Sequence, residues 1–213
     1  MDDDLPVWRL GHRSGPLEPV PWALCGWQHR WDDPQREYRT LYAAREPETC
    51  LREVLADLRP STKVLAELEE LFGPDAAAGR DAGVVSREWR DAHRLCPAWV
   101  VGDGPVADVD GDLALRRDLE RRHARMLADR GMDHLDIAEV RSRDRILTQT
   151  LGRDLHGRGF CGVVFGSHLD DQPCLALFEG RAALRSRGTP RALEVALEPL
   201  VAVCDELGLR VER

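Results

Sequence analysis

The apolar residues of this chain recur at two different spacings, one typical of strands and one typical of helices. Segments of the two kinds follow one another in no regular order. Strands are predicted over residues 5–10, 38–44, 135–140, 161–166 and 174–178, with two more inside 96–109 around the turn from Gly102 to Pro105. Helices are predicted over residues 47–58, 61–72, 113–130 and 144–156, with a last helix that opens at Thr189-Pro190 and bends near Pro199. The order lacks a strict strand–helix–strand repeat, so it favours a mixed α+β fold over a doubly wound sheet.

The helix predicted over residues 47–58 carries a charged residue on its polar face. Its apolar residues follow the i, i+3, i+4, i+7 pattern of a buried stripe, at Leu51, Val54, Leu55 and Leu58. At about 100° per residue, Glu53 lies nearly opposite that stripe. We therefore expect Glu53 to face either solvent or a cleft.

Length and composition fit one domain over residues 1–213. Hydrophobic residues make up 43% of the 213 positions, which is enough for a sizeable core, and charged residues make up 32%. The formal net charge is −8 and no block of basic residues stands out. A surface for nucleic-acid phosphates is therefore not expected.

Neither a membrane span nor a disulfide framework is expected. The chain has no run of about 18 apolar residues, and it begins with the acidic stretch Met1-Asp2-Asp3-Asp4, unlike a secretory signal. Its six cysteines include no Cys-x-x-Cys pair, so they are expected to be reduced in a cytoplasmic protein. The seven histidines show no metal-ligand spacing, and we expect no metal.

Three motifs are better explained by local structure than by chemistry. Residues 157–162 match G-x-G-x-x-G, but they follow a helix and open a strand, which is the reverse of a dinucleotide-binding loop. Residues 108–112 lack the spacing of a calcium loop and suggest a turn with a helix cap. Ser167 lacks the G-x-S-x-G elbow of a hydrolase.

Four other pieces occur in an order that resembles a known family. They are Arg30-Trp31-Asp32, Leu41-Tyr42-Ala43-Ala44, Thr49-x-Leu51-x-Glu53 and a glycine-rich strand, Gly159 to Gly166, that leads to Ser167. Together they resemble the RES-domain family, which is named for its Arg, Glu and Ser. The resemblance runs from about Trp8 to about Phe178. His168 departs from the pattern, because an arginine follows the serine in many relatives.

The resemblance implies a fold like that of ADP-ribosyltransferases, with central twisted sheets flanked by helices, and an NAD-consuming activity. Toxin members of the family are encoded beside an inhibitory antitoxin with a helix-turn-helix module, so such a partner is expected. The reaction would cleave the nicotinamide–ribose bond and pass ADP-ribose to water, phosphate or a protein. NAD is then a substrate, and no further cofactor is expected.

The residue types suit that chemistry. Positive charge grows on the ribose in an oxocarbenium-like transition state, and a fixed carboxylate, Glu53, would stabilise it. A planar guanidinium can hold a pyrophosphate, a role predicted for Arg30 with help from Arg39 or Arg9. Tyr42 would stack on nicotinamide, and Ser167 would position the ribose or the amide.

The predicted site therefore has Glu53 and Arg30 as catalytic residues and Tyr42, Ser167 and Arg39 as substrate-binding residues. We expect Arg30, Tyr42, Glu53 and Ser167 to line one concave pocket. Two other classes of function stay open from the sequence. One is an NAD- or nucleotide-binding module without turnover, which would tolerate the loss of Glu53. The other is an interaction protein on the same scaffold, which would bind no NAD.

Overall fold

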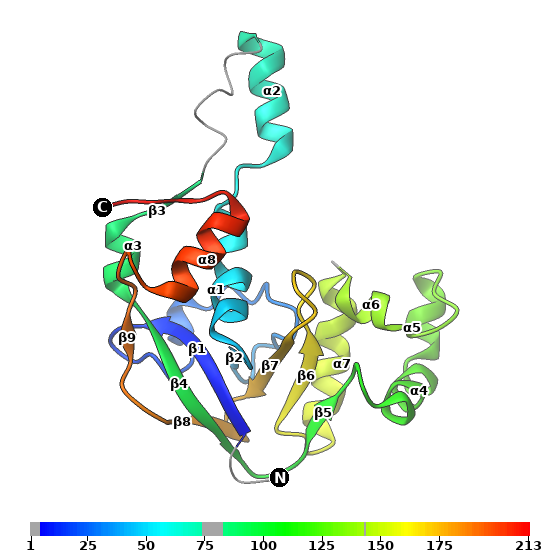
Figure 1. The fold of residues 1–213 in the computed structure, drawn as a ribbon. Coiled ribbons are helices and arrows are strands. Elements are labelled where there is room, and N and C mark those ends of the chain that lie inside the picture. The colour runs from blue at the N-terminus through cyan, green and yellow to red at the C-terminus, as the bar shows by residue number, and fades with distance from the viewer. Residues whose placement is uncertain (1–4, 74–82, 143) are drawn as a thin grey trace.

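A curved mixed sheet forms the centre of the molecule (Figure 1). The computed structural model describes residues 5–73, 83–142 and 144–213. The strand order is β5-β6-β7-β2-β1-β4-β8, with β9 paired to β4. The strands of this sheet are β1 (Leu5–His12), β2 (Thr40–Ala44), β4 (His93–Gly102), β5 (Val106–Asp108), β6 (Gly162–Gly166), β7 (Pro173–Phe178), β8 (Ala182–Ser186) and β9 (Arg191–Ala192). Only β5 and β6 pair in parallel; the other pairs in this sheet are antiparallel.

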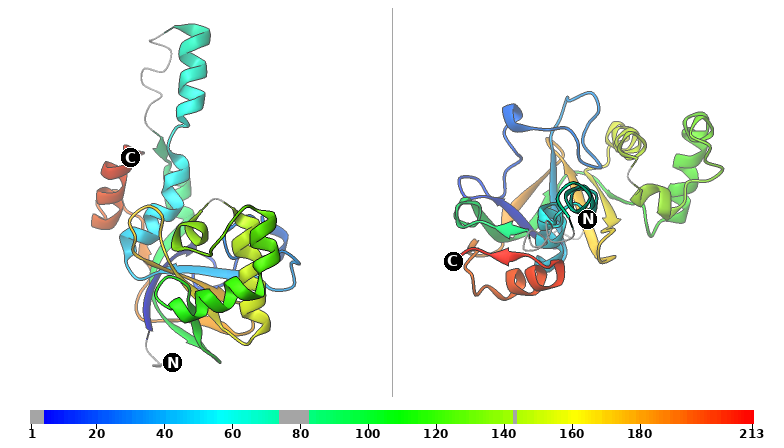
Figure 2. Two further views of the ribbon diagram at one scale, coloured as in Figure 1. Left: turned by 90° about the vertical axis from the view of Figure 1, so that its right-hand side faces the viewer. Right: turned by 90° about the horizontal axis from the view of Figure 1, so that it is seen from above.

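Helices and a small second sheet surround this centre. The second sheet joins β3 (Val84–Val85) and β10 (Arg210–Val211) in parallel. The helices are α1 (Pro47–Leu55), α2 (Thr62–Phe72), α3 (Arg87–Ala92), α4 (Leu113–Arg122), α5 (Ala124–Asp129), α6 (Ile137–Arg141), α7 (Arg145–Gly157) and α8 (Glu198–Leu207), with short 3₁₀ turns at Trp22–Leu24 and Ala56–Leu58. Helices α1 and α8 pack together beside β1, and α4 to α7 lie beyond β5 and β6 (Figures 1 and 2).

Two hydrophobic clusters hold the strands and helices together. The larger joins helix residues such as Leu51, Leu151 and Leu200 to the strands and contains the fully buried Trp31. Its buried residues in helices α1, α4, α7 and α8 show that these helices cover the sheet with their apolar faces. The smaller cluster consists of strand residues, among them Val7 and Leu177, with Leu17 packed against it. The curved sheet therefore encloses a core of its own.

The structure confirms the mixed α+β fold and corrects several predicted elements. Residues 135–140 are not a strand, because α6 begins at Ile137 and buries Val140 on one helical face. The helix predicted over 113–130 is broken at His123, whose φ of −108° and ψ of 18° separate α4 from α5. The last helix begins at Glu198 and not at residue 190. Pro199 lies in its first turn, where the missing N–H costs little.

The stripe predicted on the helix over residues 47–58 is only half buried. Leu51 and Leu55 are fully buried, but Val54 is 44% exposed and Leu58 is 37% exposed. For Leu58 the cause is that α1 ends at Leu55 and the chain continues as a 3₁₀ turn, which changes the direction of the last residues. Val54 lies inside α1, and its place on the predicted stripe is wrong. Helix α2 has no buried residue and projects from the rest of the molecule (Figures 1 and 2).

The glycine-rich segment at 157–162 behaves as its local context predicts. Helix α7 ends at Gly157, Gly159 adopts a φ of 92°, and β6 begins at Gly162. A left-handed φ of this kind favours glycine. The sequence also predicts a surface loop over residues 74–83, and most of it lies outside the described residues. In the part of the chain that the structure describes, all six cysteines are free, and no helix is long and apolar enough to cross a membrane.

Candidate active site

The end of β6 brings Ser167 into contact with Glu53 on α1. The Ser167 hydroxyl donates a hydrogen bond of 2.5 Å to Oε1 of Glu53. Ser167 is fully buried, whereas the Glu53 side chain is 33% exposed. The serine therefore anchors one carboxylate oxygen from the protein side while part of the carboxylate stays accessible. The backbone N–H of Leu169 donates to the same serine oxygen and fixes the hydroxyl in turn.

The loop between β6 and β7 is tied to the helix that carries Glu53. Asp170 in this loop accepts a hydrogen bond of 2.7 Å from the Thr49 hydroxyl and pairs with Arg52. Thr49 is fully buried. Hydrogen bonding from Thr49 and the charge of Arg52 lower the pKa of Asp170 against the opposing effect of burial, which is the largest. The Thr49 and Glu53 positions, one helical turn apart, thus both bind the loop that presents Ser167.

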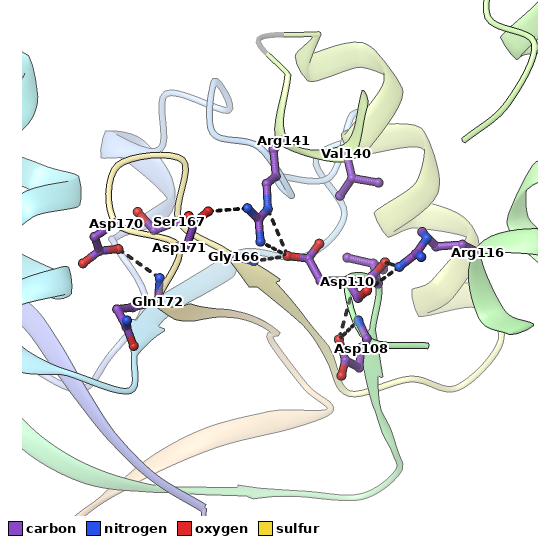
Figure 3. A network of polar contacts seen from close by, with 12 residues as sticks. Asp108, Asp110, Arg116, Val140, Arg141, Gly166, Ser167, Asp170, Asp171 and Gln172 are labelled. Carbon is purple, nitrogen blue, oxygen red and sulfur yellow. Dashed lines mark hydrogen bonds and ion pairs between the residues drawn. The ribbon is translucent and has the colours of Figure 1, made fainter. Parts of the chain in front are cut away.

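A second ionic network holds the last residue of β6 from the other side (Figure 3). Oδ2 of Asp110 accepts a hydrogen bond of 2.6 Å from the backbone N–H of Gly166 and two more from Arg141. Arg141 also pairs with Asp171 at 2.5 Å. A Cβ atom on Gly166 would lie 2.1 Å from Nη2 of Arg141, so a larger residue here would displace the Arg141 side chain from its contact with Asp110. The network fixes the strand end that precedes Ser167.

The sequence alone assigns no role to Asp110, Arg141 or Asp170. Asp110 lies in the turn that the sequence did predict: Asp108 accepts from the N–H groups of Asp110 and Gly111, and Asp112 caps α4. Nothing local indicates that Asp110 also reaches Gly166, 56 positions away. The only signal in the sequence is that all three polar residues lie close to the ends of predicted elements.

Arg30 is buried near Glu53 and is anchored to α6. Its Nη1 donates to the carbonyl oxygens of Val140 at 2.8 Å and Ser142 at 2.6 Å. Within the described part of the chain, its Nε and Nη2 donate no hydrogen bond. Burial and the neighbouring Arg145 lower the pKa of Arg30 to about 10, and the charge of Glu53 opposes that shift. Arg30 is therefore still a cation at neutral pH, with one edge of its guanidinium free.

Tyr42 lies in the middle of β2, with its hydroxyl fixed and its ring partly buried. The hydroxyl donates to Oδ1 of Asp32 at 3.0 Å and accepts from the backbone N–H of Trp31 at 2.9 Å. The ring lies 5.5 Å from that of His29. Burial, followed by the charge of Asp32, raises the pKa of Tyr42 well above its usual value. Trp31 and Asp32 directly follow Arg30 in the chain. The Tyr42 hydroxyl therefore links the segment of Arg30 to β2.

Arg39 and Arg9 do not join this group. Arg39 makes a two-pronged pair with Glu179, and its Nη1 donates to Val20. It precedes β2 at the end that pairs with Phe178, whereas Ser167 lies near the opposite end of β7. Arg9 is buried and donates to the carbonyl oxygens of Pro16, Tyr42 and Glu18. Both guanidiniums are thus committed to structural contacts.

Of the predicted site residues, Glu53 and Ser167 are in direct contact. Arg30 makes no hydrogen bond with either in the described part of the chain, although the charges of Glu53 and Tyr42 raise its pKa against the larger effect of burial. The departure at His168 places its Nδ1 4.0 Å from Oε1 of Glu53, the same oxygen that accepts from Ser167. Two cavities of about 440 and 400 Å³ are lined by residues around Trp8 and Arg191 and include none of the four predicted residues. That all four line one pocket stays a prediction.

Chemically, the arrangement offers a fixed carboxylate, a partly free guanidinium and an aromatic ring. No group of three or more His, Cys, Asp or Glu side chains among the described residues is arranged to hold a metal ion. The carboxylate and the guanidinium suit electrostatic stabilisation and hydrogen bonding by side chains.

Comparisons with known proteins agree with this architecture. A solved structure, the M. tuberculosis MbcT–MbcA toxin–antitoxin complex, contains a chain that is similar to this one with a TM-score of 0.50 and 14% identity. The match covers 95% of this chain and 87% of that chain, so it supports the fold. The curated proteins contain no match. The model of the RES domain matches residues 6–197, almost the whole described body of the molecule, and the chain therefore belongs to the RES-domain family.

Proposed function

We propose that this protein is an NAD-consuming enzyme that cleaves the bond between nicotinamide and ribose and transfers ADP-ribose to an acceptor. The observation that carries the proposal is the contact between Ser167 and Glu53. It fixes a carboxylate on one side and leaves it partly exposed on the other, in a chain of the RES-domain family. A carboxylate held in this way suits a reaction in which positive charge develops on a sugar.

In the proposed reaction, the bond between ribose C1′ and the nicotinamide nitrogen breaks, and its electron pair stays on nitrogen. The pyridinium becomes neutral nicotinamide, and positive charge appears at C1′ and the ring oxygen. Glu53 stabilises that charge through its carboxylate. An acceptor oxygen then bonds to C1′, and when the acceptor is water one proton is released. No covalent enzyme intermediate is required.

The other residues would hold the substrate. The free edge of Arg30 offers two parallel N–H donors to the pyrophosphate, since Nη1 is already used by Val140 and Ser142. The Tyr42 ring would stack on nicotinamide, and its hydroxyl anchor to Asp32 limits the motion of the ring. Ser167 acts through Glu53 as a positioning residue. Arg39, which the sequence suggested as a substrate ligand, is left out because Glu179 occupies its guanidinium.

A protein partner forms part of the same proposal. The solved structure with a similar fold is described as a toxin–antitoxin complex, and we propose that this chain is likewise restrained by an antitoxin, with a helix-turn-helix module. Expression of the chain alone should stop growth of a bacterial host, and co-expression of the cognate antitoxin should restore it. Growth that is unaffected by the active chain would contradict the toxin role but not the chemistry.

Incubation of the purified protein with NAD, followed by mass spectrometry, tests the reaction. We expect nicotinamide to be released together with ADP-ribose, or with phosphorylated ADP-ribose when inorganic phosphate is present. A mass increase on a protein would instead identify a side-chain acceptor. Intact NAD after prolonged incubation of protein free of any partner would contradict the proposal.

A further inference from the structure

Trp8, Arg187 and Arg191 line a cavity on the part of the sheet formed by β1 and β4. In the strand order, this part is separated from β6, the strand that leads to Ser167. The cavity has a volume of about 440 Å³, within the range of small-molecule sites. It is lined by Trp8 of β1, Pro97 of β4 and the segment from Arg187 to Arg191 between β8 and β9. Strands β7 and β2 separate β1 from β6, so this cavity is distinct from the candidate active site.

The two arginines are held by their faces against indole rings. The Arg187 guanidinium lies 5.1 Å from the ring centre of Trp99 and 5.7 Å from that of Trp8. The Arg191 guanidinium lies 4.8 Å from the ring centre of Trp8. Contacts of this kind use the flat face of the guanidinium and leave its N–H edges available for hydrogen bonds.

The loop that carries these arginines is fixed by hydrogen bonds. The backbone N–H of Arg187 donates to the carbonyl oxygen of Pro97, and the Ser186 hydroxyl donates to the carbonyl oxygen of Gly188. Arg191 pairs with Leu95 in the short ladder between β9 and β4. The positions of both arginines are thus set before any ligand binds, which lowers the entropy cost of binding.

Neither arginine has a carboxylate partner among the residues that the structure describes. Arg39, by comparison, is paired with Glu179. Glu194 and Glu198 line a neighbouring cavity that Arg191 shares, but they form no ion pair with it. In a chain with a net charge of −8, two unpaired cations beside one cavity create a local positive potential.

We infer that this cavity is a binding site for a phosphate group, either free or carried by a nucleotide. Two guanidinium forks can present up to four N–H donors, which suits the three terminal oxygens of a phosphate better than the two of a carboxylate. The Thr189 hydroxyl lines the same cavity and adds a further donor. The apolar floor of Trp8 and Pro97 offers contact to the organic part of a phosphate ester.

Titration calorimetry with inorganic phosphate, AMP and adenosine tests this site. We expect saturable binding of phosphate, AMP or both by the wild type. Adenosine, which lacks the phosphate, should not bind at this site. AMP binding tighter than phosphate binding identifies a nucleotide as the source of the group, and equal affinity identifies the free ion.

Variants assign the binding to the cavity. The double variant Arg187→Gln/Arg191→Gln should weaken binding at least about tenfold, since hydrogen bonds between charged groups are lost. The conservative Arg191→Lys keeps the charge over Trp8 but loses the planar fork, so it should weaken binding by about threefold or more. The control is Arg117→Gln, an exposed arginine on α4, which should bind as the wild type does. Thermal unfolding of each variant verifies the fold.

Two results would overturn the inference. One is the absence of saturable phosphate or AMP binding by the wild type at millimolar concentrations. The other is unchanged affinity in both Arg191→Lys and the double variant, which would place any bound phosphate elsewhere and leave the arginine–tryptophan cluster as a structural contact. NAD turnover is not needed for either readout, so the inference stands or falls independently of the proposed reaction.

Discussion

The Ser167 hydroxyl lies 2.5 Å from Oε1 of Glu53, although 114 positions separate the two residues along the chain. One lies just after a strand and the other on a helix, and two further contacts hold the loop after the strand to that helix, Thr49–Asp170 and Arg52–Asp170. On the other side, the hydrogen bond from Gly166 to Asp110 fixes the end of the strand. The fold therefore positions the Glu53 carboxylate through the hydrogen bond from Ser167.

Ser167→Ala should lower the turnover number about tenfold while changing the KM for NAD less than threefold. Without the hydroxyl, the Glu53 carboxylate loses its anchor and adopts more orientations, which weakens a contact made mainly in the transition state. Steady-state kinetics with NAD measure both constants. Ser61→Ala is the control, because Ser61 is exposed before α2 and its side chain makes no capping hydrogen bond. A rise in KM alone would show that Ser167 binds the substrate directly and does not act through Glu53.

Arg30→Ala should weaken NAD binding at least about tenfold, because a hydrogen-bonded charge on the pyrophosphate is lost. Arg30→Lys should recover little of that affinity, since an ammonium cannot reproduce the planar fork. Titration calorimetry with NAD measures the dissociation constants.

Arg39→Ala provides the comparison for Arg30. Its guanidinium is bound to Glu179 and Val20, so NAD affinity should stay within about twofold of the wild type. Equal affinity of the wild type and Arg30→Ala would remove Arg30 from the site. A large loss in Arg39→Ala would restore the role that the sequence suggested for it.

Asp110→Asn should destabilise the protein by about 1–3 kcal/mol, because the neutral amide loses the ion pair with Arg141 and accepts weaker hydrogen bonds from Gly166 and Arg141. Urea unfolding measures the change in the free energy of unfolding. Asp129→Asn, which affects one exposed pair with Arg125, should stay within about 0.5 kcal/mol of the wild type. Similar effects for the two variants would mean that the Asp110 network is not structural.

The two tyrosines should resist ionisation in the folded protein. Burial is the main cause that raises the pKa of both Tyr38 and Tyr42 above the usual value near 10. Because the folded state favours the neutral phenol, its stabilising effect is complete below pH 10 and is lost as the pH rises further. Near-ultraviolet absorbance should show almost no tyrosinate at about pH 10.5 in the folded protein, and about three-quarters ionisation of both groups after unfolding. Two phenols that ionise at pH 10 without unfolding would contradict the burial of these hydroxyls.

Local patterns predicted most of the sheet and the helix of Glu53, since these depend on nearest neighbours in the chain. The strand that leads to Ser167, the turn at Asp108 and the end of α7 at Gly157 are all as expected. The strand predicted over residues 135–140 is wrong because so short an apolar stretch fits the spacing of a strand and that of a helix equally well. Tertiary contacts fix the helix that forms there. Arg30, for example, donates hydrogen bonds to the carbonyl oxygens of Val140 and Ser142 at the end of this helix.

The candidate site was predictable only as far as residue types and order go. The family resemblance placed Glu53 and Ser167 together, but it could not show that the serine donates to the carboxylate. It also could not show that Glu179 occupies Arg39, because that pair joins residues 140 positions apart. Contacts of this kind depend on strand register, which the sequence of a single chain does not fix.

The measurement that tests the central claim most directly is NAD turnover by Glu53→Gln, compared with the wild type and with Glu48→Gln. Both residues lie on α1, but Glu48 is in its first turn and makes no contact with Ser167. We predict that Glu53→Gln keeps its fold and binds NAD within a few-fold of the wild type while nicotinamide release falls at least about 100-fold, because one fixed electrostatic contact is lost in the transition state. Glu48→Gln should turn over NAD normally. Near-normal turnover by a correctly folded Glu53→Gln would contradict the account.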